Sequence, residues 1–316
     1  MSRVDEFMID AEAEAAPSPS RLKARLIITR LLAWRAFALE PGVLAALPMG
    51  LLLLTGFLGP LALVVAFSLM PGQTFSLMQM PTPANFIEIV QESYYLSFLA
   101  SLYLAALTVL ILLVICYPIA FAMVRVFGRQ GSILALLITA PLFVADNLRL
   151  MGWMLFLVKG GVVSGTLQTW FGIEVDSMLY TTGATLFGLV YIYLPFMLFP
   201  IIMGISMVPL QMREAAFDLG ATRFQVLREV DVPLAMPGIL IGSLMSFILT
   251  AGALTEAKIM GGTAVVMIAM DIQKEFGFAQ NWPKGSALCV LLILLAGAFA
   301  ITALKRIDLD MIFGRK

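Results

Sequence analysis

The sequence contains no histidine, only two cysteines and few charged side chains. Charged residues make up 13% of the 316 positions. The lack of histidine excludes imidazole metal sites and histidine-based catalysis, and the cysteines are not spaced as zinc ligands. Cys116 and Cys289 both fall in apolar stretches, where we expect small core side chains rather than a disulfide. The chain is therefore predicted to be non-catalytic, and a membrane enzyme is not favoured.

The sequence also lacks the phosphate-binding loop G-x-x-x-x-G-K-[ST]. Without that loop, it has no recognisable motif for holding a nucleotide. We expect no bound cofactor, no metal and no nucleic-acid partner. If the protein depends on ATP, the nucleotide must be bound by another subunit.

Apolar residues dominate what is present. They make up 61% of the chain, and the mean hydropathy of +0.98 excludes an ordinary soluble protein. Six stretches can cross a hydrocarbon core of about 30 Å as helices of roughly 20 residues. They span residues 43–70, 95–123, 131–157, 184–208, 237–257 and 285–304. The fold class predicted is an all-α membrane protein with six transmembrane helices.

The basic residues indicate an orientation. If the N-terminus is cytoplasmic, most of the 20 basic residues lie in cytoplasmic segments, so both termini are predicted to be cytoplasmic. Within the N-terminal tail, residues 1–42, the run "RLKARLIITRLLAWRAF" has the pattern of a basic amphipathic helix on the lipid surface. A simple orientation signal is the alternative. Residues 306–316 form a short C-terminal tail, and a second amphipathic helix is predicted between Gly262 and Pro283.

One polar stretch on the predicted cytoplasmic side, "REAAFDLGATRFQVLREVDVPLAMPG", is unusual for this chain. Seven charged residues fall within positions 213–231. The first part predicts a helix that ends at Gly220, which suits the left-handed position past a helix end. Thr222 and Gln225 have the spacing of a capping box that begins a second helix. Pro233 is predicted to end that helix.

After Pro233, the next proline, Pro237, is predicted to lie in the first turn of the fifth span. In the first helix, the small residues Ala215 and Ala216 beside Glu214 allow another surface to approach closely. We interpret this helix as a docking element for a partner. An ordinary solvated loop is the alternative.

The same stretch resembles the EAA signature of permease subunits of ABC importers. Matching positions are Glu214, Ala215, Ala216, Gly220, Val230, Val232 and Pro233. The family more often has Ile and Leu where this chain has the two valines. The resemblance implies that residues 209–233 hold a coupling helix for a cytoplasmic ATPase. The residues implied to couple the two proteins are Glu214, Ala215, Ala216, Asp218 and Gly220.

A wider resemblance covers residues 84–304, including "APLFVADNLRLMGWMLFLVKGG" and "NWPKGSALCVLLILL". These stretches are similar to spermidine/putrescine importer permeases. The resemblance implies a type I importer permease fold over residues 43–305 in a bacterial inner membrane. It also implies an ATP-binding ABC ATPase dimer, an extracytoplasmic solute-binding protein and a second permease, either identical or a different homologue.

The cargo stays open between a polyamine or related organic cation and another small solute, such as iron, a phosphonate or an amino-acid-like compound. A self-contained channel or secondary carrier is a further alternative. It would predict inverted repeats or several ionisable groups at mid-membrane, and the sequence has neither.

Six side chains on spans three to five are candidates for lining a solute path. Charged groups inside a span cost about 2.5 to 3.5 kcal/mol each, so they usually face partners or water. Aromatic faces and small polar groups complete the set. The candidates are Asp146, Arg149, Trp153, Tyr191, Thr250 and Glu256.

Each candidate also has a simpler interpretation. Asp146 and Arg149 are spaced i, i+3 and can form a purely structural ion pair. Tyr191 can serve packing, and Glu256 can be neutralised by Lys258 at the outer end of span five. Prolines 195 and 200 predict a broken fourth helix.

Overall fold

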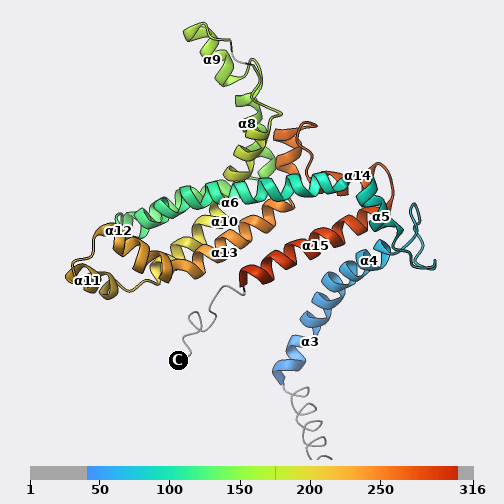
Figure 1. The fold of residues 1–316 in the computed structure, drawn as a ribbon, viewed down its shortest axis with the longest axis horizontal. Coiled ribbons are helices and arrows are strands. Elements are labelled where there is room, and N and C mark those ends of the chain that lie inside the picture. Colours follow the sequence, from blue (N-terminus) through green and yellow to red (C-terminus); the bar gives the residue numbers. More distant parts are fainter. Residues whose placement is uncertain (1–40, 175, 305–316) are drawn as a thin grey trace, which may run out of the picture. The chain divides into compact units, whose positions relative to one another are not determined.

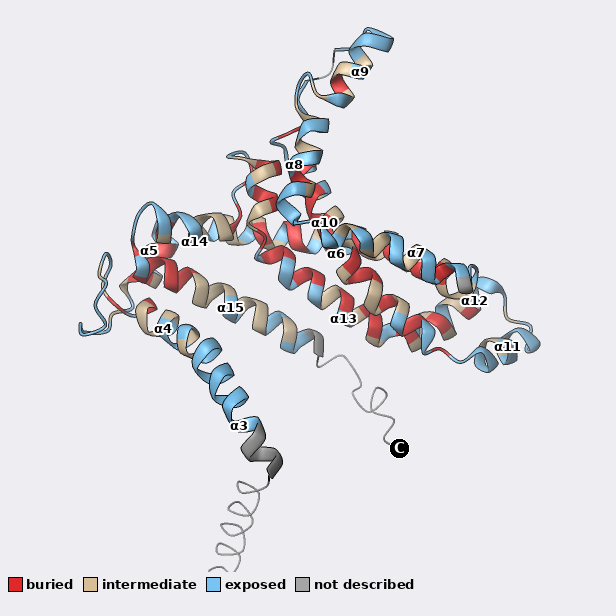
Figure 2. Ribbon diagram, turned by 180° about the vertical axis from the view of Figure 1, so that it is seen from behind, coloured by how far each residue is buried: buried red, intermediate tan, exposed pale blue. Residues whose placement is uncertain are grey.

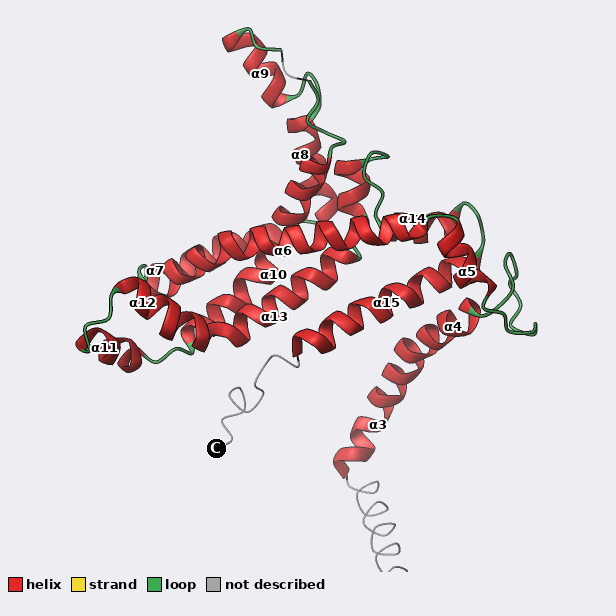
Figure 3. Ribbon diagram, in the orientation of Figure 1, coloured by secondary structure: helices red, strands yellow, loops and turns green. Residues whose placement is uncertain are grey.

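The computed structural model describes residues 41–174 and 176–304, and every regular element in these residues is a helix (Figure 3). Six helical segments among the described residues are long and apolar enough to cross a membrane, and the third of them consists of two helices, Asp146–Leu157 and Val162–Phe171. They are Ala46–Ser68, Tyr94–Arg125, Asp146–Phe171, Thr182–Ser206, Arg223–Ala251 and Trp282–Thr302. The predicted all-α, six-span class is confirmed. The predicted surface helix of the N-terminal tail and the C-terminal tail lie outside the described residues.

The chain divides into two compact units, and the first ends at Leu63. Its described part belongs to one apolar helical run, of which residues 64–68 are counted in the second unit. α3 (Pro41–Leu53) passes through a π-helical turn, η1 (Leu54–Leu58), into α4 (Gly59–Ser68). Within it, the hydroxyl of Thr55 donates to the carbonyl of Leu51 at 2.8 Å, which satisfies a polar side chain in an apolar helix.

The second unit begins at Val64 and contains the remaining elements (Figure 1). In chain order they are α5 (Ala84–Gln91), α6 (Tyr94–Arg125), α7 (Arg129–Thr139), η2 (Ala140–Phe143), α8 (Asp146–Leu157), α9 (Val162–Phe171), α10 (Thr182–Ser206), α11 (Leu210–Asp218), α12 (Arg223–Val226), η3 (Leu227–Asp231), α13 (Val232–Ala251), η4 (Ala257–Gly261), α14 (Ile268–Gly277) and α15 (Trp282–Leu304). The helix α14 confirms the second predicted amphipathic helix.

The core of the second unit lies among α6, α10 and α13, which pack on one another most extensively (Figure 2). Leu112 of α6 and Leu198 and Ile201 of α10 are fully buried. The short helices α11 and α12 lie at one end of this bundle, and α5 and α14 lie at the other (Figure 1). The bundle therefore separates two polar regions of the unit.

Glycines allow α10 and α13 to pack with their backbones in contact. A Cβ added at Gly238 of α13 would lie 2.3 Å from the carbonyl oxygen of Pro200 and 2.8 Å from the Cα of Gly204. No side chain fits at such distances. Close helix packing through small residues is a main source of stability within membranes.

We expect Gly238→Ala to destabilise the bundle by about 1–3 kcal/mol, because the added methyl must push the two backbones apart. A lower unfolding temperature of the protein in detergent would show this. The matched control is Gly252→Ala at the end of the same helix, where the nearest atom to an added Cβ is 3.8 Å away. Equal losses in both variants would contradict the packing argument.

The third predicted span is wrong as a single helix. Residues 131–157 fold as α7, η2 and α8, with extended backbone at Val144 and Ala145. Pro141 near the start of η2 lacks an N–H and clashes with the preceding turn, so the helix tightens and ends. The candidate span begins instead at Asp146, the first residue of α8, where its carboxylate suits the positive end of the helix dipole.

Two predictions about prolines 233 and 237 are also wrong. The helix does not end at Pro233 but continues from Arg223 to Ala251. The π-helical turn η3 widens the helix just before Pro233, which then occupies the first turn of α13, where a missing N–H costs little. Pro237 lies inside α13 rather than in its first turn. Consequently α12 is joined rigidly to a membrane span.

Prolines 195 and 200 do not break the fourth helix either. α10 runs through both of them from Thr182 to Ser206. It packs against both α6 and α13, and such neighbours let a membrane helix tolerate proline without a break.

Candidate functional site

The 209–233 loop forms two short helices joined by a fixed corner. α11 ends at Asp218, and Gly220 adopts a left-handed φ of 86°. The N–H of Gly220 donates to the carbonyl of Phe217 at 2.9 Å, and that of Ala221 donates to Ala216 at 3.0 Å. These two bonds form a Schellman motif. The predicted glycine corner is confirmed.

The second helix begins with the predicted capping box. The N–H of Thr222 donates to Oε1 of Gln225 at 2.8 Å, and the N–H of Gln225 donates to Oγ1 of Thr222 at 3.4 Å. The reciprocal pair satisfies two backbone donors that a helix start leaves open. The corner between α11 and α12 is thus fixed at both ends.

The outer surface of this corner combines acidic and apolar side chains. Glu214, Ala215 and Asp218 are exposed on α11, and neither acid forms an ion pair within the described part of the chain. Next to them, the side chain of Leu219 is 89% exposed and that of Phe224 is 68% exposed. The corner therefore presents acidic and large apolar groups together on one open surface.

A buried ion pair ties α11 to the start of α13. Nε of Arg213 lies 3.0 Å from Oδ1 of Asp231, in ion-pair contact without hydrogen-bond geometry. The side chain of Asp231 is only 1% exposed. The guanidinium of Arg213 also lies over the ring of Phe121, 5.4 Å from its centroid. Arg213 of α11 therefore contacts both Asp231, the residue just before α13, and Phe121 of α6.

The end of α6 closes the same region. Arg125, in the last turn of α6, donates through Nη2 to the carbonyls of Ile205 at 2.9 Å and Val208 at 2.8 Å. Those carbonyls belong to the end of α10, where backbone acceptors lack helical partners. Arg125 thereby fixes the entry into the 209–233 loop.

Four of the six predicted path residues meet between α8 and α10. Arg149 forms an ion pair with Asp146, and its side chain is only 7% exposed. Its guanidinium lies 5.7 Å from the ring centroid of Tyr191. The ring of Trp153 lies 5.7 Å from Tyr191 in an edge-on arrangement. The i, i+3 pair is thus present, together with an aromatic wall.

Glu256 belongs to the same group, but in a different way from that predicted. α13 ends at Ala251, and Glu256 lies in the following segment, just before η4. It is 4% exposed, and burial raises the pKa of its carboxyl group, which also lies within electrostatic range of Tyr193, Asp146 and Arg149. Among the described residues no ion pair joins it to the exposed Lys258, so the neutralisation proposed from the sequence is not observed.

Thr250 stays apart from this group. It is fully buried in α13, and its hydroxyl donates to the carbonyl of Ser246 one turn earlier, at 2.7 Å. The hydroxyl is thus occupied by its own helix.

Comparison with known proteins identifies the family. Residues 131–308 match the family described as "Binding-protein-dependent transport system inner membrane component". The chain belongs to this family. It is 32% identical over 237 residues to a spermidine/putrescine transport system permease protein of Haemophilus influenzae, covering 74% of this chain and 82% of the relative. The corresponding protein of Escherichia coli is 30% identical over 78% of this chain and 90% of its own length.

The fold of this permease agrees with that of a solved importer. A chain of a bacterial ABC transporter involved in the import of the acidic polysaccharide alginate superposes with a TM-score of 0.67. The superposition covers 90% of this permease and 99% of the other chain, at 15% sequence identity. The predicted ABC importer permease fold is confirmed, and the protein is a multi-pass component of a bacterial inner membrane.

Sequence reasoning missed two groups that organise this permease. One is the pair Arg213–Asp231, whose members are 18 positions apart with no shared periodicity. The other is Lys284, buried at the start of α15, whose Nζ lies 3.0 Å from Glu88 and 2.9 Å from Glu92. The only signal available was that both Asp231 and Lys284 are charges at the edge of an apolar run.

Proposed function

We propose that this permease subunit imports a polyamine, such as spermidine or putrescine, or a related organic cation. The observation that carries the proposal is its 32% identity, over 82% of the relative's length, to a permease named for those two solutes. An extracytoplasmic binding protein delivers the solute, and the permease forms half of the path through the membrane.

The chemistry of the candidate path supports a cationic cargo. Asp146 and Glu256 place two acidic side chains near the single basic side chain of Arg149. The rings of Trp153 and Tyr191 add aromatic faces that attract cations. Burial raises the pKa of Glu256, and a cation beside its carboxyl group would favour the charged form, whereas an anion would not.

The exposed corner of the 209–233 loop supports coupling to an ATPase. We assign Glu214, Ala215, Ala216 and Asp218 to the contact and Gly220 to the corner that positions them. A cytoplasmic ABC ATPase dimer would bind ATP and press on this surface. Through Arg213 and Asp231, its movement would reach α6 and α13.

A second permease completes the assembly, because six spans supply half of the usual importer path. We propose a different homologue rather than a second copy. Both termini and the 209–233 loop are assigned to the cytoplasm, in agreement with the distribution of basic residues.

Calorimetry on the partner binding protein tests the cargo. We expect tight binding of spermidine or putrescine and no binding of a phosphonate or ferric ion. In vesicles holding the whole importer, Glu256→Gln should lower spermidine uptake at least several-fold, because glutamine cannot ionise beside an arriving cation. The control Glu174→Gln changes an exposed acid beyond α9 and should have no effect. Tight binding of an anion by the binding protein would refute the proposal.

A further inference from the structure

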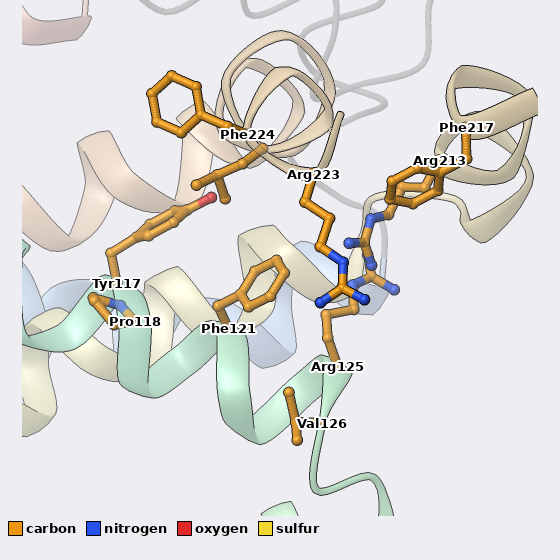
Figure 4. Close-up of a pocket in the computed structure, with 10 residues that line it drawn as sticks. Tyr117, Pro118, Phe121, Arg125, Val126, Arg213, Phe217, Arg223 and Phe224 are labelled. Carbon is orange, nitrogen blue, oxygen red and sulfur yellow. The ribbon is translucent and has the colours of Figure 1, made fainter. Parts of the chain in front are cut away.

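A cavity of about 630 Å³ lies between the end of α6 and the two helices of the 209–233 loop (Figure 4). Its lining has two kinds of side chain. Arg125, Arg213 and Arg223 come from three different elements and point toward one another across it (Figure 4). The rest of the wall is mainly aromatic and apolar, with Tyr117 and Phe121 on α6.

The charges around this cavity do not balance. Within the described residues, Arg213 is paired with Asp231, whereas Arg125 and Arg223 have no acidic partner. The Nη2 group of Arg125 donates hydrogen bonds to two backbone carbonyls. Its buried Nε has no hydrogen-bond acceptor among the described residues. Two guanidinium groups without an ion-pair partner face one space, and an anion between them would relieve their mutual repulsion. Guanidinium groups bind phosphate oxygens well, through paired N–H donors.

The position of the cavity along α6 indicates an amphipathic anion. α6 has 32 residues and is therefore roughly 48 Å long. The hydrocarbon core is about 30 Å thick, so the last turns of α6, with Arg125, reach the headgroup layer. Phe121 and Tyr117, about one and two turns earlier, lie at the boundary with the acyl chains. The cavity thus has a cationic part in the headgroup layer and an apolar part below it.

We propose that this cavity binds one anionic phospholipid. Its phosphate lies between Arg223 and Arg125, and the upper part of an acyl chain packs on Tyr117 and Phe121. Basic pockets at the membrane surface of transport proteins suit such headgroups. The lipid would join α6 to α12, and so to the helix that continues into α13. The site depends on neither the cargo nor the polyamine assignment.

Photo-crosslinking of the assembled importer in lipid nanodiscs tests this site. A photoactivatable phosphatidylglycerol should label peptides from residues 117–126 and 223–227. Arg223→Gln should reduce this labelling about tenfold, because one charge-assisted contact to phosphate is lost. Arg228→Gln, an exposed arginine of η3 that does not line the cavity, should label like the unchanged protein. Arg223→Lys should retain part of the labelling.

Other occupants give different results, each of which overturns the proposal. A phosphatidylcholine probe that labels the same peptides equally would show that the charge is irrelevant. Competition by excess inorganic phosphate would show an anion site without a lipid. Labelling that appears only after deletion of residues 1–20 would assign the cavity to the acidic N-terminal tail. Labelling that appears only after removal of the ATPase would assign it to that subunit.

Discussion

Glu214→Lys is expected to reduce ATP-driven uptake more than about tenfold while the permease still inserts into the membrane. Glu214 is exposed on α11, outside every described ion pair and away from the packed core, so its reversal leaves folding intact. Lysine at position 214 would place a positive charge where the docked ATPase accommodates a negative one, and a charge mismatch in an interface costs several kcal/mol. The measurement is solute uptake and ATP hydrolysis in vesicles that contain the whole importer.

The matched control is Glu229→Lys, which reverses an exposed acid of η3 outside α11. It should retain uptake.

Gly220→Val should also reduce ATP-driven uptake. A β-branched residue at φ 86° is strained by about 1–3 kcal/mol, although no neighbouring atom blocks its Cβ. Normal uptake in both Glu214→Lys and Gly220→Val would exclude the assigned coupling role.

Asp231→Ala should destabilise the 209–233 loop by about 3–5 kcal/mol, because it leaves Arg213 partly buried without its counter-ion. The side chains of Arg213 and Asp231 are 17% and 1% exposed, so water compensates little of the loss. Hydrogen exchange of the backbone amides of α11 and α12 measures the change locally. We expect faster exchange there, together with weaker coupling between ATP hydrolysis and uptake.

The double variant Arg213→Met, Asp231→Leu shows whether the loss of stability in Asp231→Ala comes from the unpaired charge of Arg213 or from the loss of packing. Replacing a buried pair by apolar side chains of similar volume is often neutral or stabilising. Slow exchange should therefore return in the double variant. If exchange in Asp231→Ala alone stays unchanged, the ion pair does not hold the loop.

Local features of the sequence were the most predictable. Gly220, Thr222 and Gln225 specify a helix end and a helix start through contacts within six positions, and both motifs formed as expected. The spans were predictable for a similar reason. A run of about 20 apolar residues must cross the bilayer as a helix, whatever surrounds it.

The errors arose where neighbouring elements decide the outcome. By themselves, Pro233 favours a helix end and Pro237 favours a helix start, yet the π turn at Leu227–Asp231 and the packing of α10 on α13 keep the helix continuous through both. The break before Asp146 was missed because apolar periodicity continues across it.

The sequence by itself determined the class of this protein, the number of its spans and the fixed corner at Gly220, because these depend on transfer free energy and on local backbone geometry. Only the tertiary structure decided which charges meet. Arg213 pairs with Asp231, and the guanidinium of Arg149 lies over the ring of Tyr191. Glu256 is buried near Tyr193 and forms no described ion pair with Lys258. A buried charge pairs with a group that the packed helices bring within a few ångströms of it. The distance between two side chains on different helices cannot be read from their separation along the sequence.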